Sequence, residues 1–502
     1  MSTPSLAPSV PPKPLLDAVF GGVWPDGTTP DQATPGRPRL LAASAVVGLL
    51  AAVVVPFRDF GLATFLALVA VFGVVAAADR RLLSPSHLAA GALCLLLTST
   101  LLVRDAAWVV ALALMAAFAV GAAVLAGGRS VVGIVASGAA VPLAGLRGLP
   151  WLGRSLRGSS AADRPADAWW SLLRTTTVSL LLVLVFGALF ASADALFAQW
   201  AGALVPDLSS VDAFFRGFVF LAFAGLTLTG VYVALCPPRV ERLSVPAGRP
   251  VSRSFEWLVP VGLVVGVFAV FVAAQLTVMF GGHSYLRRTT GLTYAEYVHQ
   301  GFGQLTVATL LTLAVVATTV RKAPRTTGRD RVLLRVLLGA LCTLTLVVVA
   351  SALYRMHVYE QAYGFTRLRL LVSVFEAWLG VVVVLVLAAG VRLRGPWVPW
   401  AALLTGATML LGLAAVNPDA YIAERNIERF EQTGRIDWYY LSGLSADATP
   451  VLAALPEMYR ACAVEGVPPQ DDWLEWNLGR ARAFDTVRGL ALPAGGSCRS
   501  RP

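Results

Sequence analysis

Apolar stretches of membrane-spanning length follow one another along most of the chain. A helix needs about 20 apolar residues to cross roughly 30 Å of hydrocarbon. Eleven stretches meet or nearly meet this length, at approximately 40–56, 60–78, 87–103, 106–126, 176–197, 211–236, 256–280, 302–320, 331–353, 370–390 and 397–416. The pattern predicts an all-α, polytopic membrane protein with about 11 spans, within a range of 10 to 12.

One further apolar run, residues 131–145, is shorter and is interrupted by glycine. Its length favours an interfacial or re-entrant helix over a twelfth span. If this run did cross the bilayer, the orientation of every later segment would reverse. The run therefore decides the topology of the second half of the chain.

The two ends of the chain differ from the apolar middle, residues 40–416. Residues 1–39 hold nine prolines and no apolar core after a basic start, which predicts a disordered Pro-rich tail and not a signal peptide. Residues 417–490 are polar and predict a small helical module, and residues 491–502 a disordered end.

Capping residues predict where the helices of this module begin and end. Asn417 is a capping residue, Pro418 suits the first helical position, and Gly434 would stop the helix after about Thr433. Asp437 could cap a short second helix. A third helix is predicted from about Asp447 towards Cys462, and a last one from about Asp471 to Leu490.

Composition and charge agree with this reading. The chain is 57% hydrophobic and only 14% charged, with a mean hydropathy of +0.71. A net charge of +11 could indicate nucleic-acid binding, but the arginines fall between apolar spans, and we expect no nucleic-acid partner. With eleven spans and a cytoplasmic N-terminus, the inside segments carry 22 Lys and Arg and the outside loops 7. Positive charges favour the cytoplasmic side, so the C-terminal tail is predicted outside.

The usual signatures of catalysis and metal binding are missing from the sequence. There is no Walker motif, no His-Glu-x-x-His, no Gly-x-Ser-x-Gly and no Cys-x-x-Cys. We therefore assign no catalytic residue, no metal and no cofactor. Three cysteines, Cys94, Cys236 and Cys342, are typical of small core residues. Cys462 and Cys498 could pair if the tail faces an oxidising compartment.

Two segments, 293–302 and 354–369, combine aromatic and charged residues beside apolar spans, on the predicted outer face. Four-residue steps place Arg355, Tyr359 and Tyr363 on one helix face. Arg355 could pair with Glu296 or Glu360. An interfacial belt of aromatic residues is the alternative to a ligand-binding surface. The candidate ligand-binding residues are Glu296, Tyr297, Arg355, Tyr359, Glu360, Tyr363, Arg367 and, inside the tenth span, Glu376.

Polar side chains inside the spans are the remaining candidates, because they are costly in lipid and usually paired or functional. Asp194 and Arg216 lie towards the same end of their spans and are a candidate ion pair. Gln275 lies in the seventh span. Glu376 is the best candidate for a proton-coupled or ligand-binding carboxylate, with a helix-to-helix hydrogen bond as the alternative.

Four strings of the sequence resemble bacterial multi-pass proteins of the domain-of-unknown-function families 4153 and 4173. They are Tyr-Gly-Phe-Thr-Arg-Leu-Arg at 363–369, which is the most specific, and the segments 295–302, 417–420 and 441–448. The resemblance covers roughly residues 170–480. It implies a bacterial plasma-membrane (inner-membrane) protein with a helical tail, and it implies no reaction.

Three classes of function stay open. The first is a non-enzymatic envelope protein, transport-like or ligand-sensing, that uses the outer-face cluster of Tyr, Glu and Arg. The second is a scaffold or signalling protein whose tail, residues 417–490, binds a protein partner. The third is a membrane enzyme that acts on a lipid-linked substrate through Glu296 and Glu360. We favour the first class, and membrane lipid is a partner in all three.

Overall fold

A computed structural model of the chain describes residues 37–149, 151–152, 210–243, 251, 253–290, 302–464, 470–488 and 490, with scattered positions between 175 and 194. Every regular element of these residues is helical. Among them, eight helices are long and apolar enough to cross a membrane, and three shorter apolar helices accompany them. The chain is therefore a polytopic helical membrane protein, which confirms the predicted fold class.

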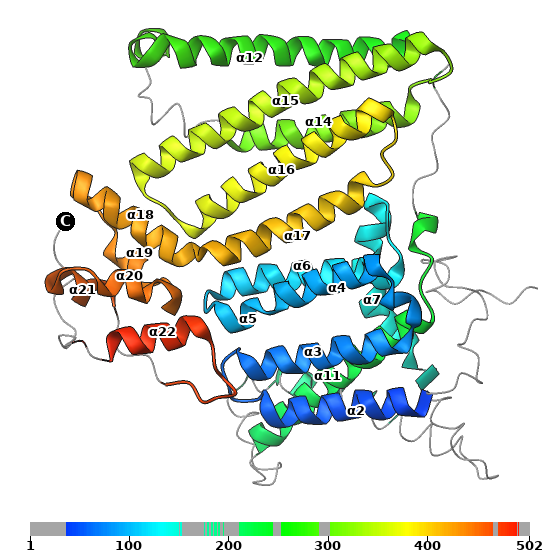
Figure 1. Cartoon of the computed structure of the whole chain (residues 1–502), viewed down its shortest axis with the longest axis vertical. Helices are drawn as coiled ribbons and strands as arrows, with labels where there is room; N and C mark the ends of the chain where they lie inside the picture. The colour runs from blue at the N-terminus through cyan, green and yellow to red at the C-terminus, as the bar shows by residue number, and fades with distance from the viewer. Residues whose placement is uncertain are drawn as a thin grey trace, which may run out of the picture.

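The first group of helices forms the lower half of Figure 1. It comprises α2 (Arg37–Val54), α3 (Leu62–Ala78), α4 (Pro85–Thr98) with its continuation α5 (Thr100–Val103), α6 (Ala107–Ala126) and α11 (Ser210–Leu235). These bounds match the predicted runs within a few residues. The prediction of disorder up to residue 39 was wrong at its end, since α2 already begins at Arg37. The predicted span 176–197 lies largely outside the described residues.

The second group lies above the first in Figure 1. It comprises α12 (Phe255–Thr290), α14 (Phe302–Lys322), α15 (Gly328–Tyr363) and α16 (Arg367–Arg392). Helix α17 (Val398–Val416) lies between the groups and packs against α6 and α16. At 1.5 Å per residue, α15 is about 54 Å long and exceeds the hydrocarbon thickness. The predicted run 331–353 was too short because the helix continues through polar residues to Gly364, whose φ of +87° ends it.

Successive helices run in opposite directions, so the bundle has two ends. We call the end where α2, α15 and α17 begin the first end, and the end where α17 passes into the tail the second end. A hydrogen bond from Arg81 to the Ala234 carbonyl oxygen, 2.8 Å, ties α11 to the turn after α3 at the first end. At the second end, Arg216 of α11 donates to the carbonyl oxygens of Ala52 and Val53 in α2.

Helix α7 (Val131–Arg147) is the run predicted to be interfacial or re-entrant. At its start, Glu241 of the 3-10 helix η2 (Val240–Leu243) accepts the backbone N–H groups of Arg129 and Ser130. Just after its other end, the Trp151 ring lies 5.7 Å from that of Tyr232, in the last turn of α11. Both ends of α7 therefore stay beside the first end, which fits a helix that does not cross.

Small residues allow the helices of the first group to approach closely. A Cβ added to Gly48 of α2 would lie 2.7 Å from Ala224 Cβ and 2.8 Å from the Phe220 carbonyl oxygen in α11. A Cβ on Gly230 of α11 would lie 2.5 Å from Val75 Cγ2 of α3. Close backbone approach through glycine and alanine is typical of membrane helices, where lipid removes the hydrophobic drive for association.

The tail forms a small helical module at the second end (Figure 1). Its elements are α18 (Pro418–Thr433), α19 (Trp438–Ser442), η3 (Ala446–Ala448), α20 (Thr449–Ala453), α21 (Glu457–Ala463) and α22 (Leu478–Val487). The predicted caps of α18 are confirmed, with Asn417 accepting from Ala420 N–H and Gly434 at φ +69°. Asp437 caps α19 as predicted.

Two predictions for the tail were wrong in extent. The helix expected from Asp447 towards Cys462 is broken into η3, α20 and α21, because Pro456 at the cap of α21 cannot continue the helix before it. The helix expected from Asp471 begins only at Leu478, where Asn477 accepts the N–H groups of Gly479 and Arg480. Residues 470–477 instead contact the first group at the second end, where Asp472 pairs with Arg58 and the Leu474 carbonyl oxygen accepts the Ala63 N–H.

Candidate functional site

A buried carboxylate, Asp419, holds the tail to the membrane helices. Both of its oxygens accept from the Arg367 guanidinium at the start of α16, at 3.0 Å and 2.5 Å. It also accepts from Trp108 Nε1 of α6 at 3.0 Å and from the Ser445 backbone N–H at 2.9 Å. Burial opposes ionisation, but these donors outweigh it and hold the pKa of Asp419 below its ordinary value.

A second buried carboxylate, Asp447, joins the tail to the turn between α5 and α6. Its Oδ2 accepts the backbone N–H groups of Asp105 and Ala106, both at 2.8 Å. Its Oδ1 accepts no hydrogen bond from the described residues, but Arg104 lies 4.0 Å from it and donates to the carbonyl oxygen of Ala414 at the end of α17. Burial raises the pKa of Asp447, and the hydrogen bonds and the Arg104 charge offset this only in part.

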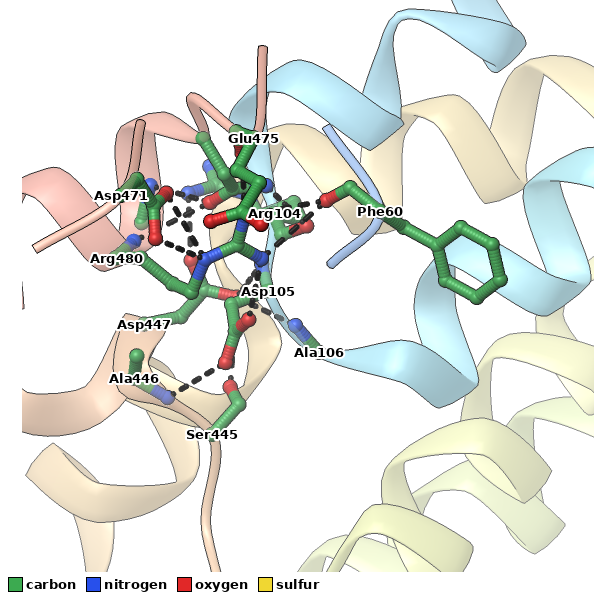
Figure 2. A network of polar contacts seen from close by, with 12 residues as sticks. Phe60, Arg104, Asp105, Ala106, Ser445, Ala446, Asp447, Asp471, Glu475 and Arg480 are labelled. Carbon is green, nitrogen blue, oxygen red and sulfur yellow. Dashed lines mark hydrogen bonds and ion pairs between the residues drawn. The ribbon is translucent and has the colours of Figure 1, made fainter. Parts of the chain in front are cut away.

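Arg480 of α22 completes this network, as Figure 2 shows. Its guanidinium lies 3.0 Å from Asp471 and 3.1 Å from Asp105, and it donates to the Phe60 carbonyl oxygen at 3.3 Å. Beside this network, the backbone at Gly61 approaches the backbone of the tail closely. A Cβ on Gly61 would lie 2.1 Å from the Glu475 carbonyl oxygen. We call the set Arg104, Asp105, Arg367, Asp419, Asp447 and Arg480 the tail junction.

Three of the strings that carry the family resemblance meet at the tail junction. Arg367 comes from the string 363–369, Asp419 from 417–420, and the Ser445 N–H from 441–448. Arg367 was predicted as a ligand-binding residue, but its guanidinium is engaged by Asp419 and holds the tail. The sequence analysis did not predict this pairing of Arg367 with Asp419.

A different polar arrangement occupies the second group of helices. Glu376 of α16 is 0% exposed, and its Oε2 accepts from Thr306 Oγ1 of α14 at 2.8 Å. Its other oxygen, Oε1, is buried without a hydrogen-bond partner among the described residues. One oxygen of Glu376 thus forms the predicted helix-to-helix hydrogen bond. The second oxygen receives no hydrogen bond from the described residues, and we call such an oxygen unfilled.

Arg355 of α15 is buried and reaches across to α12. Its Nη2 donates to Gln275 Oε1 at 2.7 Å, and Ser351 Oγ donates to the same oxygen at 3.3 Å. The predicted pair with Glu360 does not form between these two described residues, because positions five apart lie on different sides of a helix. The alternative partner, Glu296, lies outside the described residues, as does Tyr297, and that pairing stays a prediction.

Glu360 is 6% exposed, and its Oε1 also has no hydrogen-bond partner among the described residues. On the neighbouring face of α15, the rings of Tyr359 and Tyr363 lie 4.8 Å apart, which agrees with their predicted alignment. The Arg369 guanidinium lies 4.5 Å above the Tyr359 ring. The two tyrosines suit the interfacial belt, whereas a buried carboxylate does not.

The contact between α15 and α16 orders these groups by depth. A Cβ on Gly380 would lie 3.1 Å from Val349 Cγ1, so these two positions face each other. From this level, Glu376, Arg355 and Glu360 lie about 6, 9 and 16 Å towards the second end, at 1.5 Å per residue. We call Glu360, Arg355, Gln275, Thr306 and Glu376 the polar series. Its unfilled atoms are carboxylate oxygens, which accept hydrogen bonds and attract cations.

The next candidate is the predicted ion pair between Asp194 and Arg216. Arg216 donates to the last carbonyl oxygens of α2, and its guanidinium lies 5.9 Å from the Phe57 ring. Asp194 is exposed at the end of its segment. Their ion pair stays a prediction. Within the described residues, no group of three or more His, Cys, Asp or Glu side chains is placed to hold a metal ion.

The fold and these two sites define a polytopic helical membrane protein with a docked helical tail. The family model described as Domain of unknown function (DUF4153) matches residues 91–455, so the chain belongs to this family. The match begins in α4 and ends in the tail, and thus starts well before the stretch on which the resemblance rested. Comparison with curated proteins and with solved structures found no match.

Proposed function

We propose that the chain is a non-enzymatic, solute-binding membrane protein, transport-like or ligand-sensing, whose site is the polar series. The observation that carries this proposal is Glu376, a fully buried carboxylate with one oxygen left without a partner. Buried polar atoms are almost always hydrogen-bonded, and an exception asks for a functional explanation or a bound species.

The chemistry of the unfilled atoms limits the solute. Glu376 Oε1 and Glu360 Oε1 are acceptors, so a matching solute donates hydrogen bonds or carries positive charge. Arg355 is already engaged with Gln275, which leaves the two carboxylates as the groups open to such a solute. A small monovalent metal cation carries the positive charge, and an ammonium ion or a protonated amine carries the charge and also donates hydrogen bonds.

The binding test measures thermal unfolding of the purified protein in detergent with Na⁺, K⁺, ammonium or methylammonium added. A ligand that binds the folded state alone raises the unfolding temperature with its concentration. We expect one of these cations to stabilise the wild type and the exposed control Glu424→Gln, but not Glu376→Gln. If Glu376→Gln responds to every cation as the wild type does, the proposal fails.

The proposal also includes a bacterial plasma membrane, with the N-terminus in the cytoplasm and the tail outside. The excess of positive charge at the first end supports this orientation. Cys462 is disulfide-bonded, which suits an oxidising compartment. Its expected partner Cys498 lies outside the described residues, and that pairing stays a prediction. A reporter active only outside the cytoplasm, fused after Pro502, should be active, and the matching cytoplasmic reporter silent.

A second candidate function is docking of a protein partner by the tail. It is favoured by the exposure of large aromatic side chains there, with Tyr439 91% exposed in α19. Replacing the tail would disturb the tail junction as well, so a surface change is the cleaner test. If Tyr439→Ala abolishes function in a deletion strain while Glu376→Gln preserves it, the partner-docking function is the better one.

A further inference from the structure

A large apolar cavity lies at the first end of the second group, far from the polar series. Its volume is about 930 Å³, and its walls come from α14, α15 and α16. Val131 of α7 and Ala402 of α17 close it on the side of the first group. Leu313, Val316 and Leu338 are typical of the lining. The size is that of a binding pocket for a sizeable ligand.

The charged part of the lining is entirely positive. It consists of Arg325, Arg335 and Arg394, and none of the described residues that line the cavity is acidic. Arg325 is fixed by hydrogen bonds to the carbonyl oxygens of Val320 and Leu393. Within the described part of the chain, the guanidinium groups of Arg335 and Arg394 have no hydrogen bond or ion pair. Their N–H donors are therefore available to an anion.

An apolar interior with a cationic rim matches an amphiphile. A small soluble anion would leave the apolar walls empty, and an uncharged apolar molecule would leave the guanidinium groups without a counter-charge. The cavity is open to its surroundings, since Val391 in its lining is 68% exposed. Basic pockets between membrane helices are known binding places for anionic lipid headgroups.

We propose that this cavity binds an anionic phospholipid from the surrounding leaflet. The phosphate lies between Arg335 and Arg394, and the acyl chains lie against Leu313, Val316 and Leu338. Because Val131 belongs to α7, the lipid contacts both groups of helices. Glu241 fixes the start of α7 through the N–H groups just before Val131, so this wall of the cavity is anchored. The site stands apart from the polar series and does not rest on the proposed solute binding.

The first test is native mass spectrometry of the detergent-purified protein, titrated with phosphatidylglycerol or phosphatidylcholine. We expect one tightly retained phosphatidylglycerol and clearly weaker binding of phosphatidylcholine. Arg335→Gln/Arg394→Gln should weaken phosphatidylglycerol binding about 10-fold or more for each guanidinium lost, since a hydrogen bond between charged groups contributes at least that factor. The matched control is Arg329→Gln/Arg392→Gln, two exposed arginines at the same end that do not line the cavity.

A second variant tests the apolar part without touching charge. A Cβ added to Gly339, which lines the cavity, meets no atom within 4 Å, so the position has room for a larger side chain and Gly339→Leu tests the apolar volume. It should weaken both lipids while the protein keeps its helical circular dichroism. The proposal is overturned if both lipids bind equally to the wild type. It is also overturned if the control double variant loses as much affinity for phosphatidylglycerol as the cavity double variant. It is also overturned if inorganic phosphate displaces the lipid while Gly339→Leu binds normally, which would mean a small-anion site.

Discussion

Asp419 in the tail junction and Glu376 in the polar series are both fully buried carboxylates at the same end of the molecule, yet their oxygens differ in hydrogen bonding. Asp419 has a donor for each oxygen, from Arg367, Trp108 and Ser445. Glu376 has a donor for one oxygen only, among the described residues. A carboxylate whose acceptors are filled by its own chain serves structure. Asp447 also has an oxygen, Oδ1, without a hydrogen bond, but the Arg104 charge lies 4.0 Å from it. Glu376 has no ion pair among the described residues, so its free oxygen is available to another species.

The energetics of burial explain why the difference matters. Removing one partner of a buried, hydrogen-bonded charge pair leaves the other charge uncompensated and is strongly destabilising. Removing a group that is already under-satisfied relieves a cost of burial. Replacing the acid by a neutral residue should therefore be strongly destabilising at Asp419 and have little effect at Glu376. The predictions below test that contrast.

The largest effect is expected for Asp419→Ala. It leaves Arg367 and the Trp108 N–H without their acceptor, which should cost about 3 kcal/mol of stability, the low end of the range for a broken buried pair, because the Arg367 side chain is 34% exposed. Hydrogen exchange of α19 to α21, followed by mass spectrometry, should show a loosened tail. Asp485→Ala, at an exposed position of α22, is the control and should leave exchange unchanged. Equal protection in wild type and Asp419→Ala would mean that the tail is held elsewhere.

Gly61→Ala should have the next largest effect on stability. Its Cβ would lie 2.1 Å from the Glu475 carbonyl oxygen, so the tail backbone has to move. Overpacking of this kind costs about 1–3 kcal/mol. Gly73→Ala on α3, where a Cβ meets nothing within 4 Å, should be neutral or slightly stabilising. The comparison is made by thermal unfolding in detergent, and an equal effect of the two variants would contradict the close crossing.

The stability of the docked tail should depend on pH in opposite directions through the two aspartates Asp419 and Asp447. The folded-state pKa of Asp419 is lowered, so its contribution is present above the ordinary aspartate value and is lost as pH falls below it. The folded-state pKa of Asp447 is raised, so protonation of Asp447 on lowering the pH towards the ordinary value favours the folded tail. Tail protection in hydrogen exchange should thus pass through a maximum at mildly acidic pH.

Asp447→Asn separates the two contributions. It should remove the rise on mild acidification and keep the loss at lower pH, because Asp419 is untouched. The measurement is the same exchange experiment across a pH series, corrected for the intrinsic exchange rate. A variant that keeps the rise would show that another group is responsible.

Much of the fold could be predicted because it is encoded locally. The apolar run 302–320 became α14 (Phe302–Lys322), and Asn417 and Gly434 bound α18 as their capping chemistry requires. Two helix extents were predicted wrongly, one because the apolar stretch does not mark the end of the helix and one because the breaking effect of a proline was not taken into account. Helix α15 runs past its apolar stretch because no breaker occurs before Gly364, and Pro456 divides a helix expected to be continuous.

The candidate site was predicted only in part, for a different reason. The depth and polarity of Glu376 were evident from its place in an apolar run. The tail junction was not, because its bonds join positions far apart, such as Asp105 and Asp447, 342 residues distant. No local pattern shows that Arg367 and Asp419 meet. A clue lay in the resemblance, since the strings that carry it are the ones that build this junction.

The smallest effect on stability, and the sharpest test of the contrast, is expected for Glu376→Gln. The glutamine keeps an oxygen to accept from Thr306 and removes a buried charge that has one unfilled oxygen, so stability should change by less than about 1 kcal/mol, the size of a single net hydrogen bond. Thr306→Val, which removes the donor and leaves the carboxylate, should cost more than Glu376→Gln. Both are compared by thermal unfolding in detergent without added cations. If Glu376→Gln instead destabilises the protein as much as Asp419→Ala, then Glu376 serves structure as Asp419 does, and the distinction between filled and unfilled carboxylates is lost.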